Sequence, residues 1–327
     1  MNFVVDSIDI GYGVTKGVKG LGDADRVSFP SAVGSPDQAS FSLGLTGRPS
    51  HLIKPVDALI GTSAVKQSAF ISEGRRDRDW VKSQTWYSLF CFAMSRLIHA
   101  DNVTANLVVG LPISYYTKDR NWVRDRLEAL HEIQVEGHGV QHIRINECRV
   151  VPQGWGVALD YVFEDGGRIT PEALQLKIGV IDVGSCTTNL LTLDGLTEVP
   201  HQSLSVQVGA MDVLNAVQSR LDAKFPGLNM RQHKLARLVQ KRSVRYDGEP
   251  HGISDVVDEV SYPLAQNVAD QARGHWGDAH DIDKILIAGG GGLLLGSYLQ
   301  EHFPRARVMP NGIYSNAVGM WYLGKYT

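Results

Sequence analysis

The sequence predicts an α/β protein built from two duplicated domains, and three observations lead to this prediction. Short apolar runs typical of buried strands alternate with segments of helical periodicity along the chain. The length of 327 residues is enough for about two domains. A strand that ends in Asp, an aliphatic residue and Gly occurs twice, at Asp9 and at Asp182, about one domain apart.

In the first half, apolar runs bounded by turn residues predict strands, and apolar positions spaced by three or four predict helices. The expected strands are Phe3–Ile10, Arg26–Val33, Asn106–Leu111, Ile133–Glu136 and His142–Val151. The expected helices are Ser63–Ser72, Trp80–Ala100, Tyr115–His131 and Gly156–Phe163. The mixed-charge run Glu73–Asp79 is expected on the solvated surface.

The same patterns continue in the second half. The expected strands are Lys177–Val183, Thr188–Leu193 and Ile282–Ala288. The expected helices are Met211–Phe225, Tyr262–Trp276 and Asn311–Tyr326, and the polar segment 226–260 is expected to be helical in part. Gly166, Gly167 and Pro171 mark a loop. The predicted domains are therefore 1–167 and 168–310, with the C-terminal helix 311–327 packing back onto the first.

Composition excludes several classes of function. The chain has 32 Lys and Arg against 35 Asp and Glu, which gives no case for direct contact with nucleic acid. No apolar run approaches the roughly 20 residues that cross a bilayer, so no membrane association is expected. The three cysteines show no CxxC spacing, and the N-terminus lacks a basic signal region, so a cytoplasmic location is expected. The GxxxxGK[ST], GxGxxG and GxSxG signatures are absent from the sequence.

The repeat is the most informative feature. Val5–Lys16 aligns with Ile178–Asn189, and each copy reads as a buried strand, Asp, an aliphatic residue, Gly, three variable residues, Thr and a polar residue. Glycines let the backbone approach an anion, and successive N–H groups then form a concave phosphate site. A carboxylate at the end of each strand can hold Mg²⁺ through water, and Lys16 can reach the phosphates. The simpler alternative is two ordinary hairpins with Asp in the turn.

A third element follows the second copy of the repeat. The apolar strand at Ile285 runs into four successive glycines and then into a helix that begins near Leu293. Backbone without side chains can lie against a flat base or ribose, and a helix N-terminus favours phosphate. Taken alone, this element is equally consistent with a tight strand–helix turn.

In this order and spacing, the three elements resemble the ATPase superfamily of actin, Hsp70 and the sugar kinases. The resemblance implies two duplicated ribonuclease H-like, actin-type domains flanking a nucleotide cleft. Its motifs are a first phosphate loop at Asp9–Lys16, a second at Asp182–Asn189, an adenosine motif at Ile285–Leu293 and connecting helices that start in Val151–Ala158 and Asn311–Gly319. Within the superfamily, three features resemble the bacterial and archaeal actin-like group that includes the ParM/StbA plasmid-segregation proteins. They are Asp9-Ile10-Gly11-Tyr12-Gly13, Val108–Pro112 and Pro152-Gln153-Gly154.

The resemblance also implies a site for ATP or ADP with Mg²⁺. Asp9 and Asp182 would organise the metal and the attacking water, and Gln153 would orient that water. The nucleotide-binding residues that it implies are Gly11, Tyr12, Gly13, Val14, Thr15, Lys16, Gly184, Ser185, Cys186, Thr187, Thr188, Gly209, Asp212, Gly289, Gly290, Gly291 and Gly292. Cys186 and Asn189 depart from the usual second loop: the first adds bulk beside the phosphate and the second removes a negative charge.

The function implied is an ATP-hydrolysing protein that polymerises into filaments, with slow turnover outside the filament. Plasmid or DNA segregation would then need a DNA-binding adaptor protein, which agrees with the near-neutral charge. Two alternatives on the same fold remain open: a small-molecule, sugar-type kinase, and a nucleotide-gated regulator that does not polymerise. For the kinase, Glu73, Asp77 and Asp79 are candidates only because they are acidic.

Overall fold

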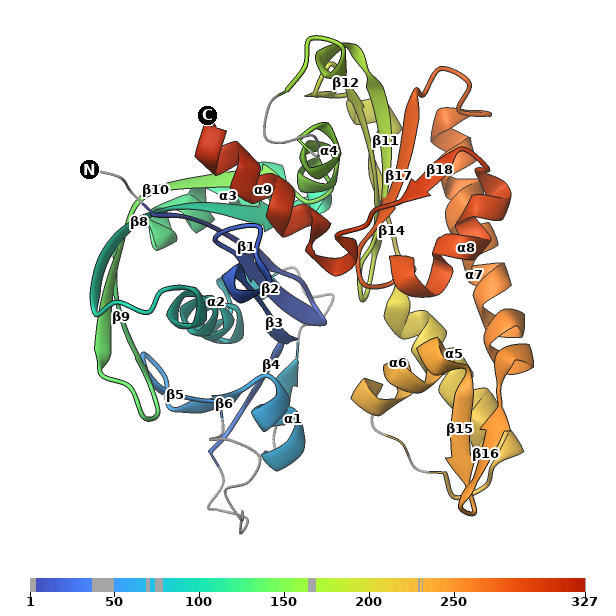
Figure 1. Ribbon diagram of the computed structural model, residues 1–327, viewed down its shortest axis with the longest axis horizontal. Helices are drawn as coiled ribbons and strands as arrows, with labels where there is room; N and C mark the ends of the chain where they lie inside the picture. Colours follow the sequence, from blue (N-terminus) through green and yellow to red (C-terminus); the bar gives the residue numbers. More distant parts are fainter. Residues whose placement is uncertain are drawn as a thin grey trace. The chain divides into compact units, whose positions relative to one another are not determined.

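The computed structural model describes residues 4–36, 50–68, 71–73, 79–163, 169–228, 230 and 232–326 (Figure 1). The chain divides into two compact units. Unit 1 is Met1–Arg168 with Tyr314–Thr327, and unit 2 is Ile169–Ile313. The glycine pair 166–167, where the sequence predicts the domain boundary, lies outside the described residues, as do residues 74–78 of the charge run.

The described strands of unit 1 form one sheet in the order β3-β2-β1-β8-β10-β9-β5-β6-β4-β7. Its strands are β1 (Val4–Ile10), β2 (Val14–Val18), β3 (Arg26–Pro30), β4 (Ala32–Gly34), β5 (His51–Lys54), β6 (Ala58–Ile60), β7 (Ile71–Glu73), β8 (Asn102–Leu111), β9 (Leu130–Val135) and β10 (Val140–Pro152). Its helices are η1 (Asp23–Asp25), α1 (Thr62–Gln67), η2 (Trp80–Lys82), α2 (Gln84–Leu97), α3 (Ile113–Leu127), α4 (Trp155–Val162) and α9 (Ser315–Tyr326).

Unit 2 has a sheet in the order β13-β12-β11-β17-β18, with β14 also paired to β12, and a separate hairpin of β15 and β16. Its strands are β11 (Lys177–Val183), β12 (Thr188–Asp194), β13 (Thr197–Glu198), β14 (Leu204–Val206), β15 (Ser243–Tyr246), β16 (Glu249–Gly252), β17 (Lys284–Ala288) and β18 (Ala306–Val308). Its helices are η3 (Ala173–Gln175), η4 (Pro200–Gln202), α5 (Ala210–Lys224), α6 (Gln232–Lys241), α7 (Ser254–Trp276) and α8 (Gly292–His302), and η5 (Gly312–Tyr314) leads into α9.

The central strands of the two units are arranged alike. β1 pairs antiparallel with β2 and parallel with β8, just as β11 pairs antiparallel with β12 and parallel with β17. The register matches as well, because Asp9 lies opposite Lys16 and Asp182 lies opposite Asn189. The duplicated strand–turn–strand predicted from the sequence is therefore confirmed at the level of individual cross-strand pairs.

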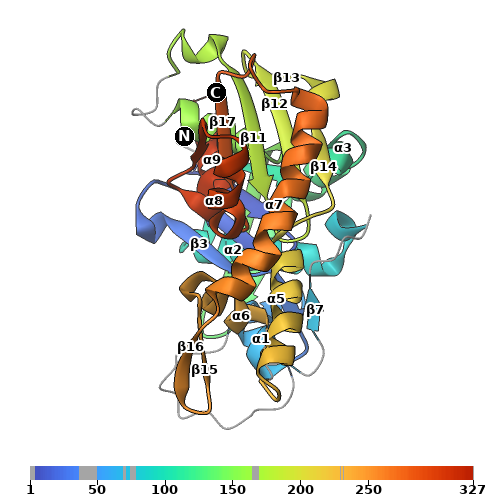
Figure 2. The same cartoon turned by 90° about the vertical axis from the view of Figure 1, so that its right-hand side faces the viewer.

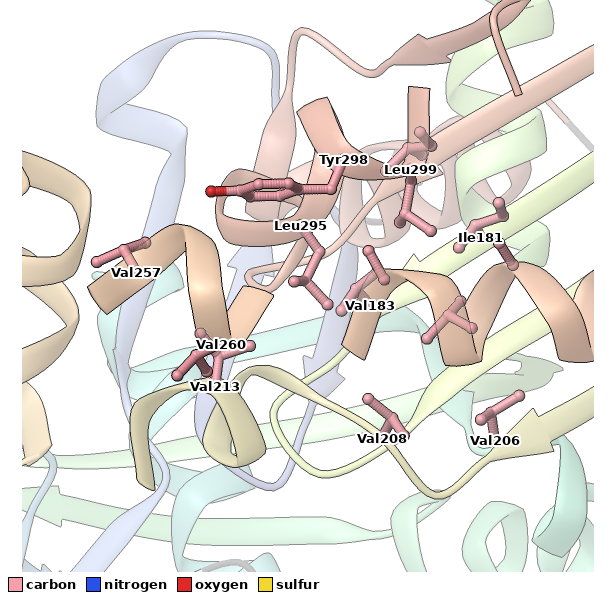
Figure 3. Packing of buried hydrophobic residues seen from close by; sticks show 14 of the residues in the cluster. Ile181, Val183, Val206, Val208, Val213, Val257, Val260, Leu295, Tyr298 and Leu299 are labelled. Carbon is pink, nitrogen blue, oxygen red and sulfur yellow. The ribbon is translucent and has the colours of Figure 1, made fainter. Parts of the chain in front are cut away.

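The core of unit 2 lies between its sheet and its helices. Ile181 and Val183 point from β11 toward Leu295 and Leu299 of α8, and all four are buried (Figure 3). Helices α7 and α8 lie side by side (Figures 1 and 2). Among the described residues, no helix is both long enough and apolar enough to span a membrane.

The predicted strand Arg26–Val33 is two strands, β3 and β4, which break at Ser31 and pair with different neighbours. The predicted helix Trp80–Ala100 is the short helix η2 followed by α2, which is capped at its start by Ser83.

Three further segments also differ from the sequence prediction. Helix α3 ends at Leu127 rather than His131, because His131, Ile133 and Val135 alternate inward as part of strand β9. Helix α1 ends at Gln67, and strand β7 begins at Ile71, where the sequence predicts one helix to Ser72.

The third difference lies in the polar segment 226–260, which contains helix α6, as expected, and also an unpredicted hairpin of β15 and β16. Asp247 and Gly248 occupy its turn with φ of 47° and 84°. Two positive φ values in a two-residue turn match the twist of the flanking strands, and Asp-Gly is a preferred sequence for that turn. Helix α7 then begins at Ser254, ahead of the predicted Tyr262.

Two glycines allow α4 and α9 to cross closely in unit 1. A Cβ atom built on Gly319 would lie 1.7 Å from the carbonyl oxygen of Gly156, and one built on Gly156 would lie 2.1 Å from the carbonyl oxygen of Asn316. The obstructing atoms are backbone atoms, so a side chain at either position would push the helices apart. This crossing holds α9, from the end of the chain, against the segment that follows β10.

Replacing Gly319 with alanine should therefore destabilise the protein by about 3 kcal/mol through forced separation of α4 and α9. The matched control is Gly274→Ala in α7, where an added Cβ meets no atom within 4 Å. The control should stabilise by about 0.5–1 kcal/mol, because alanine loses less conformational freedom than glycine on folding. Urea unfolding followed by tryptophan fluorescence measures both, and equal midpoints for the two variants would contradict the assigned crossing.

Candidate functional site

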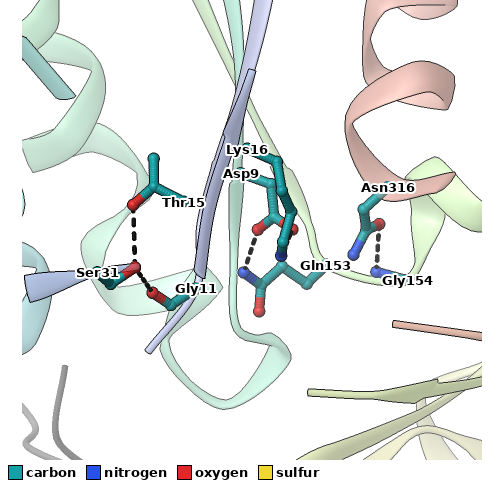
Figure 4. Close-up of polar contacts among 8 residues, drawn as sticks. All are labelled: Asp9, Gly11, Thr15, Lys16, Ser31, Gln153, Gly154 and Asn316. Carbon is teal, nitrogen blue, oxygen red and sulfur yellow. Dashed lines mark hydrogen bonds and ion pairs between the residues drawn. The ribbon is translucent and has the colours of Figure 1, made fainter. Parts of the chain in front are cut away.

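In unit 1, the three residues Asp9, Lys16 and Gln153 come together at the end of β1. The Asp9 side chain is buried. Its Oδ2 accepts a hydrogen bond from Lys16 Nζ at 2.7 Å, and the two charged groups form an ion pair (Figure 4). Its Oδ1 accepts a hydrogen bond from Gln153 Nε2 at 2.8 Å. The sequence separates Asp9 from Gln153 by 144 positions, so the fold brings together residues that the sequence could only suggest as partners.

Gln153 is held by backbone contacts on both sides. Its own N–H donates to the carbonyl of Leu111 at 2.7 Å, which anchors it to the end of β8. The next residue, Gly154, has a φ of 95° and donates its N–H to Asn316 Oδ1 at 3.0 Å. Only glycine adopts this backbone conformation without strain. The glutamine amide is therefore fixed in position and in orientation, with Nε2 toward Asp9 and Oε1 left as an acceptor.

The first loop turns sharply between β1 and β2. A Cβ atom on Gly11 would lie 3.1 Å from the carbonyl oxygen of Val14, which favours glycine there. The loop carbonyls of Gly11 and Gly13 accept hydrogen bonds from the hydroxyl and the N–H of Ser31, at 2.6 and 3.0 Å. The buried ring of Tyr12 packs against Trp80, which anchors the middle of the loop.

The second loop, between β11 and β12, has the same plan in unit 2. Asp182 is the penultimate residue of β11 and is 7% exposed. Gly184 closes the turn by donating its N–H to the carbonyl of Thr187 at 2.8 Å. Thr188 donates its hydroxyl to the carbonyl of Val208 at 2.8 Å. Cys186 is only partly buried in this loop.

Helix α5 begins directly beside the second loop. Gly209 precedes the helix, and a Cβ atom there would lie 2.6 Å from the carbonyl oxygen of Ser185. Asp212 Oδ2 accepts a hydrogen bond from the Gly209 N–H at 2.8 Å. This contact satisfies a donor at the start of the helix, so Asp212 has a capping role in the fold.

The glycine turn after β17 lies against the end of β11. Gly289 has a φ of 85°, and a Cβ atom on it would lie 2.3 Å from the carbonyl oxygen of Val183 and 2.5 Å from Asp182 Oδ1. Gly291 donates its N–H to the carbonyl of Val183 at 2.8 Å. Unit 2 therefore gathers Asp182, the second loop and the glycine turn at the carboxyl ends of parallel strands, where open α/β sheets bind ligands.

These features fit a nucleotide and Mg²⁺. The glycines let the loop backbone pack closely, since a Cβ atom on Gly209, Gly289 or Gly291 would collide with neighbouring atoms of unit 2. Backbone N–H groups in tight loops of this kind can bind phosphate. Among the described residues, no group of three or more His, Cys, Asp or Glu side chains could hold a metal ion. One or two carboxylates are nevertheless sufficient for Mg²⁺, which keeps most of its waters and binds substrate phosphates.

Two residues that the sequence analysis did not assign to the site also contact it. Ser31 binds the first loop, and Asn316 binds the segment of Gln153. Ser31 lies two positions after Phe29, which pairs with Thr15 across strands β2 and β3. The sequence does not show that pairing, so it gives no signal for Ser31. Asn316 lies within the predicted second connecting segment, although its contact with Gly154 has no signal in the sequence.

Comparison with known families and structures gives consistent matches over both halves. The family model described as actin like proteins, N terminal domain, matches residues 7–156. The model described as archaeal actin homologue MreB-like, C-terminal, matches residues 180–301. Among curated proteins, none matches the sequence.

Solved structures match over the full length. The crystal structure of an archaeal actin homolog is 23% identical and has a TM-score of 0.82, with 99% of each chain covered. A ParM from a 15-stranded filament of Clostridium botulinum is also 23% identical, with a TM-score of 0.81 and 100% of each chain covered. The archaeal homolog in complex with ADP is 22% identical with a TM-score of 0.79, covering 99% of this chain and 100% of that chain. At these identities the likeness establishes the fold.

Proposed function

We propose that this chain, which belongs to the actin-like proteins, is a Mg²⁺-dependent ATPase that assembles into filaments. The observation that supports this proposal most strongly is the contact of Asp9 with both Lys16 and Gln153. A carboxylate, a cation and a neutral amide meet there at the end of a strand, beside a glycine-rich loop. The repeat of the same strand, carboxylate and loop at Asp182 adds a second set of phosphate-binding groups.

Hydrolysis in this arrangement depends on positioning and electrostatics. Mg²⁺ would neutralise phosphate charge and would be held through water by Asp9 and Asp182. Lys16 stabilises negative charge on the phosphates, and the backbone of both loops binds their oxygens. Gln153 presents Oε1 to the attacking water while Nε2 stays bound to Asp9. Because an amide cannot accept the proton of that water, turnover should be slow until assembly improves the geometry.

The role that we propose in the cell rests on the resemblance to the ParM/StbA plasmid-segregation proteins. We assign the chain to the segregation of plasmid or other DNA in the cytoplasm, acting through a DNA-binding adaptor protein. The near balance of 32 basic and 35 acidic residues supports an indirect link to DNA. One matching structure is a ParM filament, and another is an archaeal actin homolog with ADP, which supports self-assembly and nucleotide binding as the pair of activities to test.

Phosphate release at increasing protein concentration tests this proposal. If hydrolysis accompanies assembly, the rate per molecule should rise steeply once the protein exceeds a critical concentration. A constant rate per molecule would contradict it and favour a nucleotide-gated regulator. Release of ADP without free phosphate, dependent on an added sugar, would instead identify a small-molecule kinase.

A further inference from the structure

We propose that Ser31 is a positioning residue that holds the first phosphate loop in its binding conformation. This inference rests on the proposed function, since it assumes that the loop binds phosphate. The Ser31 hydroxyl donates to the carbonyl of Gly11 at 2.6 Å and lies 2.9 Å from the hydroxyl of Thr15 (Figure 4). Because a serine hydroxyl has a single proton, Thr15 is the donor in the second contact.

The backbone of Ser31 completes the hold on the loop. Its N–H donates to the carbonyl of Gly13 at 3.0 Å, so one residue binds the loop on both sides of Tyr12. Ser31 is 2% exposed, and it stands between the end of β3 and the start of β4. A buried hydroxyl that bonds to two partners restrains both of them, because the hydroxyl itself has little access to water.

Comparison of the two units shows what is special about this serine. Thr15 and Thr188 occupy equivalent places, opposite Phe29 and Val206. Ser31 follows Phe29 by two positions, and Val208 follows Val206 by two positions, so Ser31 and Val208 are also equivalent. In unit 1 the threonine hydroxyl binds a side chain, whereas in unit 2 it binds the carbonyl of Val208.

The loop carbonyls are held differently as well. Gly11 and Gly184 occupy equivalent places, each two residues after the aspartate. The carbonyl of Gly184 accepts from the N–H of Ala210 at 2.9 Å, and that of Ser185 accepts from the N–H of Met211 at 2.8 Å. Unit 2 thus fixes its loop with backbone donors at the start of α5. In unit 1, the carbonyl of Gly11 instead accepts its hydrogen bond from the Ser31 hydroxyl. The conformation of the first loop at Gly11 therefore depends on a side chain, which a substitution can remove.

The test compares Ser31→Ala with Ser203→Ala in nucleotide binding. Ser203 is a matched control, because its hydroxyl also makes two hydrogen bonds, to the carbonyl of Val199 and from the N–H of Thr192, away from both loops. We expect Ser31→Ala to weaken ATP and ADP binding about tenfold, as the loss of one buried and one partly buried hydrogen bond would, and to leave AMP binding unchanged. Ser203→Ala should bind ATP, ADP and AMP like the wild type. Ser31→Thr, which keeps the hydroxyl, should bind ATP with an affinity near that of the wild type. The proposal would be overturned if Ser31→Ala weakened AMP binding as much as ATP binding, or if it left ATP binding unchanged.

Hydrogen exchange without nucleotide separates failure of this inference from failure of the proposed function. In Ser31→Ala, the amides of residues 11–14 should exchange faster, while those of residues 184–187 keep the wild-type rate. Unchanged exchange at residues 11–14 would refute the role of Ser31 whether or not the protein binds ATP. If Ser31→Ala does not fold, Ser31→Cys replaces it, since a thiol has a similar shape and donates weakly. A wild-type protein that binds no ATP, yet shows the faster exchange in the variant, would refute only the proposed function.

Discussion

Asp9→Asn should lower the rate of ATP hydrolysis by about 10²–10³-fold, the scale seen when one preorganised electrostatic group is removed from an active site. The Asp9 carboxylate binds both Lys16 Nζ and Gln153 Nε2, so the substitution removes the negative charge and disturbs the amide that orients the water. Phosphate release under single-turnover conditions, with Mg²⁺ and saturating ATP, measures the effect.

The control for this variant must separate lost chemistry from lost stability. Asp9→Asn leaves the ammonium of Lys16, whose side chain is 12% exposed, without its anion. Adding Lys16→Met removes that unpaired charge, so the double variant should regain stability and remain inactive. Asp25→Asn removes a partly exposed carboxylate 4.0 Å from Lys19 and should hydrolyse ATP at the wild-type rate. Near-normal hydrolysis by Asp9→Asn would contradict the assigned role of Asp9.

Asp6→Asn should make the protein more stable above pH 7 and remove a pH dependence of the wild type. Asp6 lies in β1 with no exposed surface, and within the described part of the chain neither carboxylate oxygen has a hydrogen-bond partner. Burial raises the pKa of Asp6 from 3.8 to about 7, and Lys19 lowers it by a smaller amount. The ammonium of Lys19 donates to the carbonyl of Leu97 at 3.0 Å, and it makes no hydrogen bond to either carboxylate oxygen of Asp6.

The pH window follows from the raised pKa. The folded state keeps the proton up to about pH 7, whereas the unfolded chain releases it near pH 3.8. The free energy of unfolding should therefore fall by up to about 4 kcal/mol as the pH rises between these two values. Below and above this pH range, Asp6 should change the free energy of unfolding little. Urea unfolding from pH 4 to pH 8 checks this, with Asp101→Asn at an exposed position as the control for the loss of one carboxylate. If Asp6→Asn unfolds with the same pH dependence as the wild type, Asp6 does not hold a proton in the folded protein.

The fold could be predicted largely because its signals are local and repeated. The strands that carry Asp9 and Asp182 near their ends each have a buried apolar run followed by glycine, and the same pattern gives the same pairing in both units. The actin-type fold with two domains, which the resemblance of these motifs to a known superfamily implies, is confirmed by the matching structures. Errors arose where periodicity changed within an apolar segment, as at His131, which continues a helical pattern but lies in a strand.

The site could be predicted only in part, because its contacts join distant segments. Glycine-rich loops and terminal aspartates have recognisable sequences, and Gln153 stands in a recognisable segment. The hydroxyl of Ser31 and the amide of Asn316 act through tertiary contacts that no spacing in the chain encodes. The carboxylate of Asp6, which has no hydrogen-bond partner among the residues that the structure describes, looks in the sequence like any acidic residue in a short strand.

The most direct test of nucleotide-driven assembly is light scattering at 90° by the purified protein with Mg²⁺ and ATP, ADP or no nucleotide. With ATP, scattering should rise above a critical protein concentration and should then decay as ADP accumulates. Protein should pellet at the plateau, and ADP alone should give little signal. Flat traces at micromolar protein concentrations, in samples shown separately to bind ATP, would contradict the proposal that this chain forms filaments.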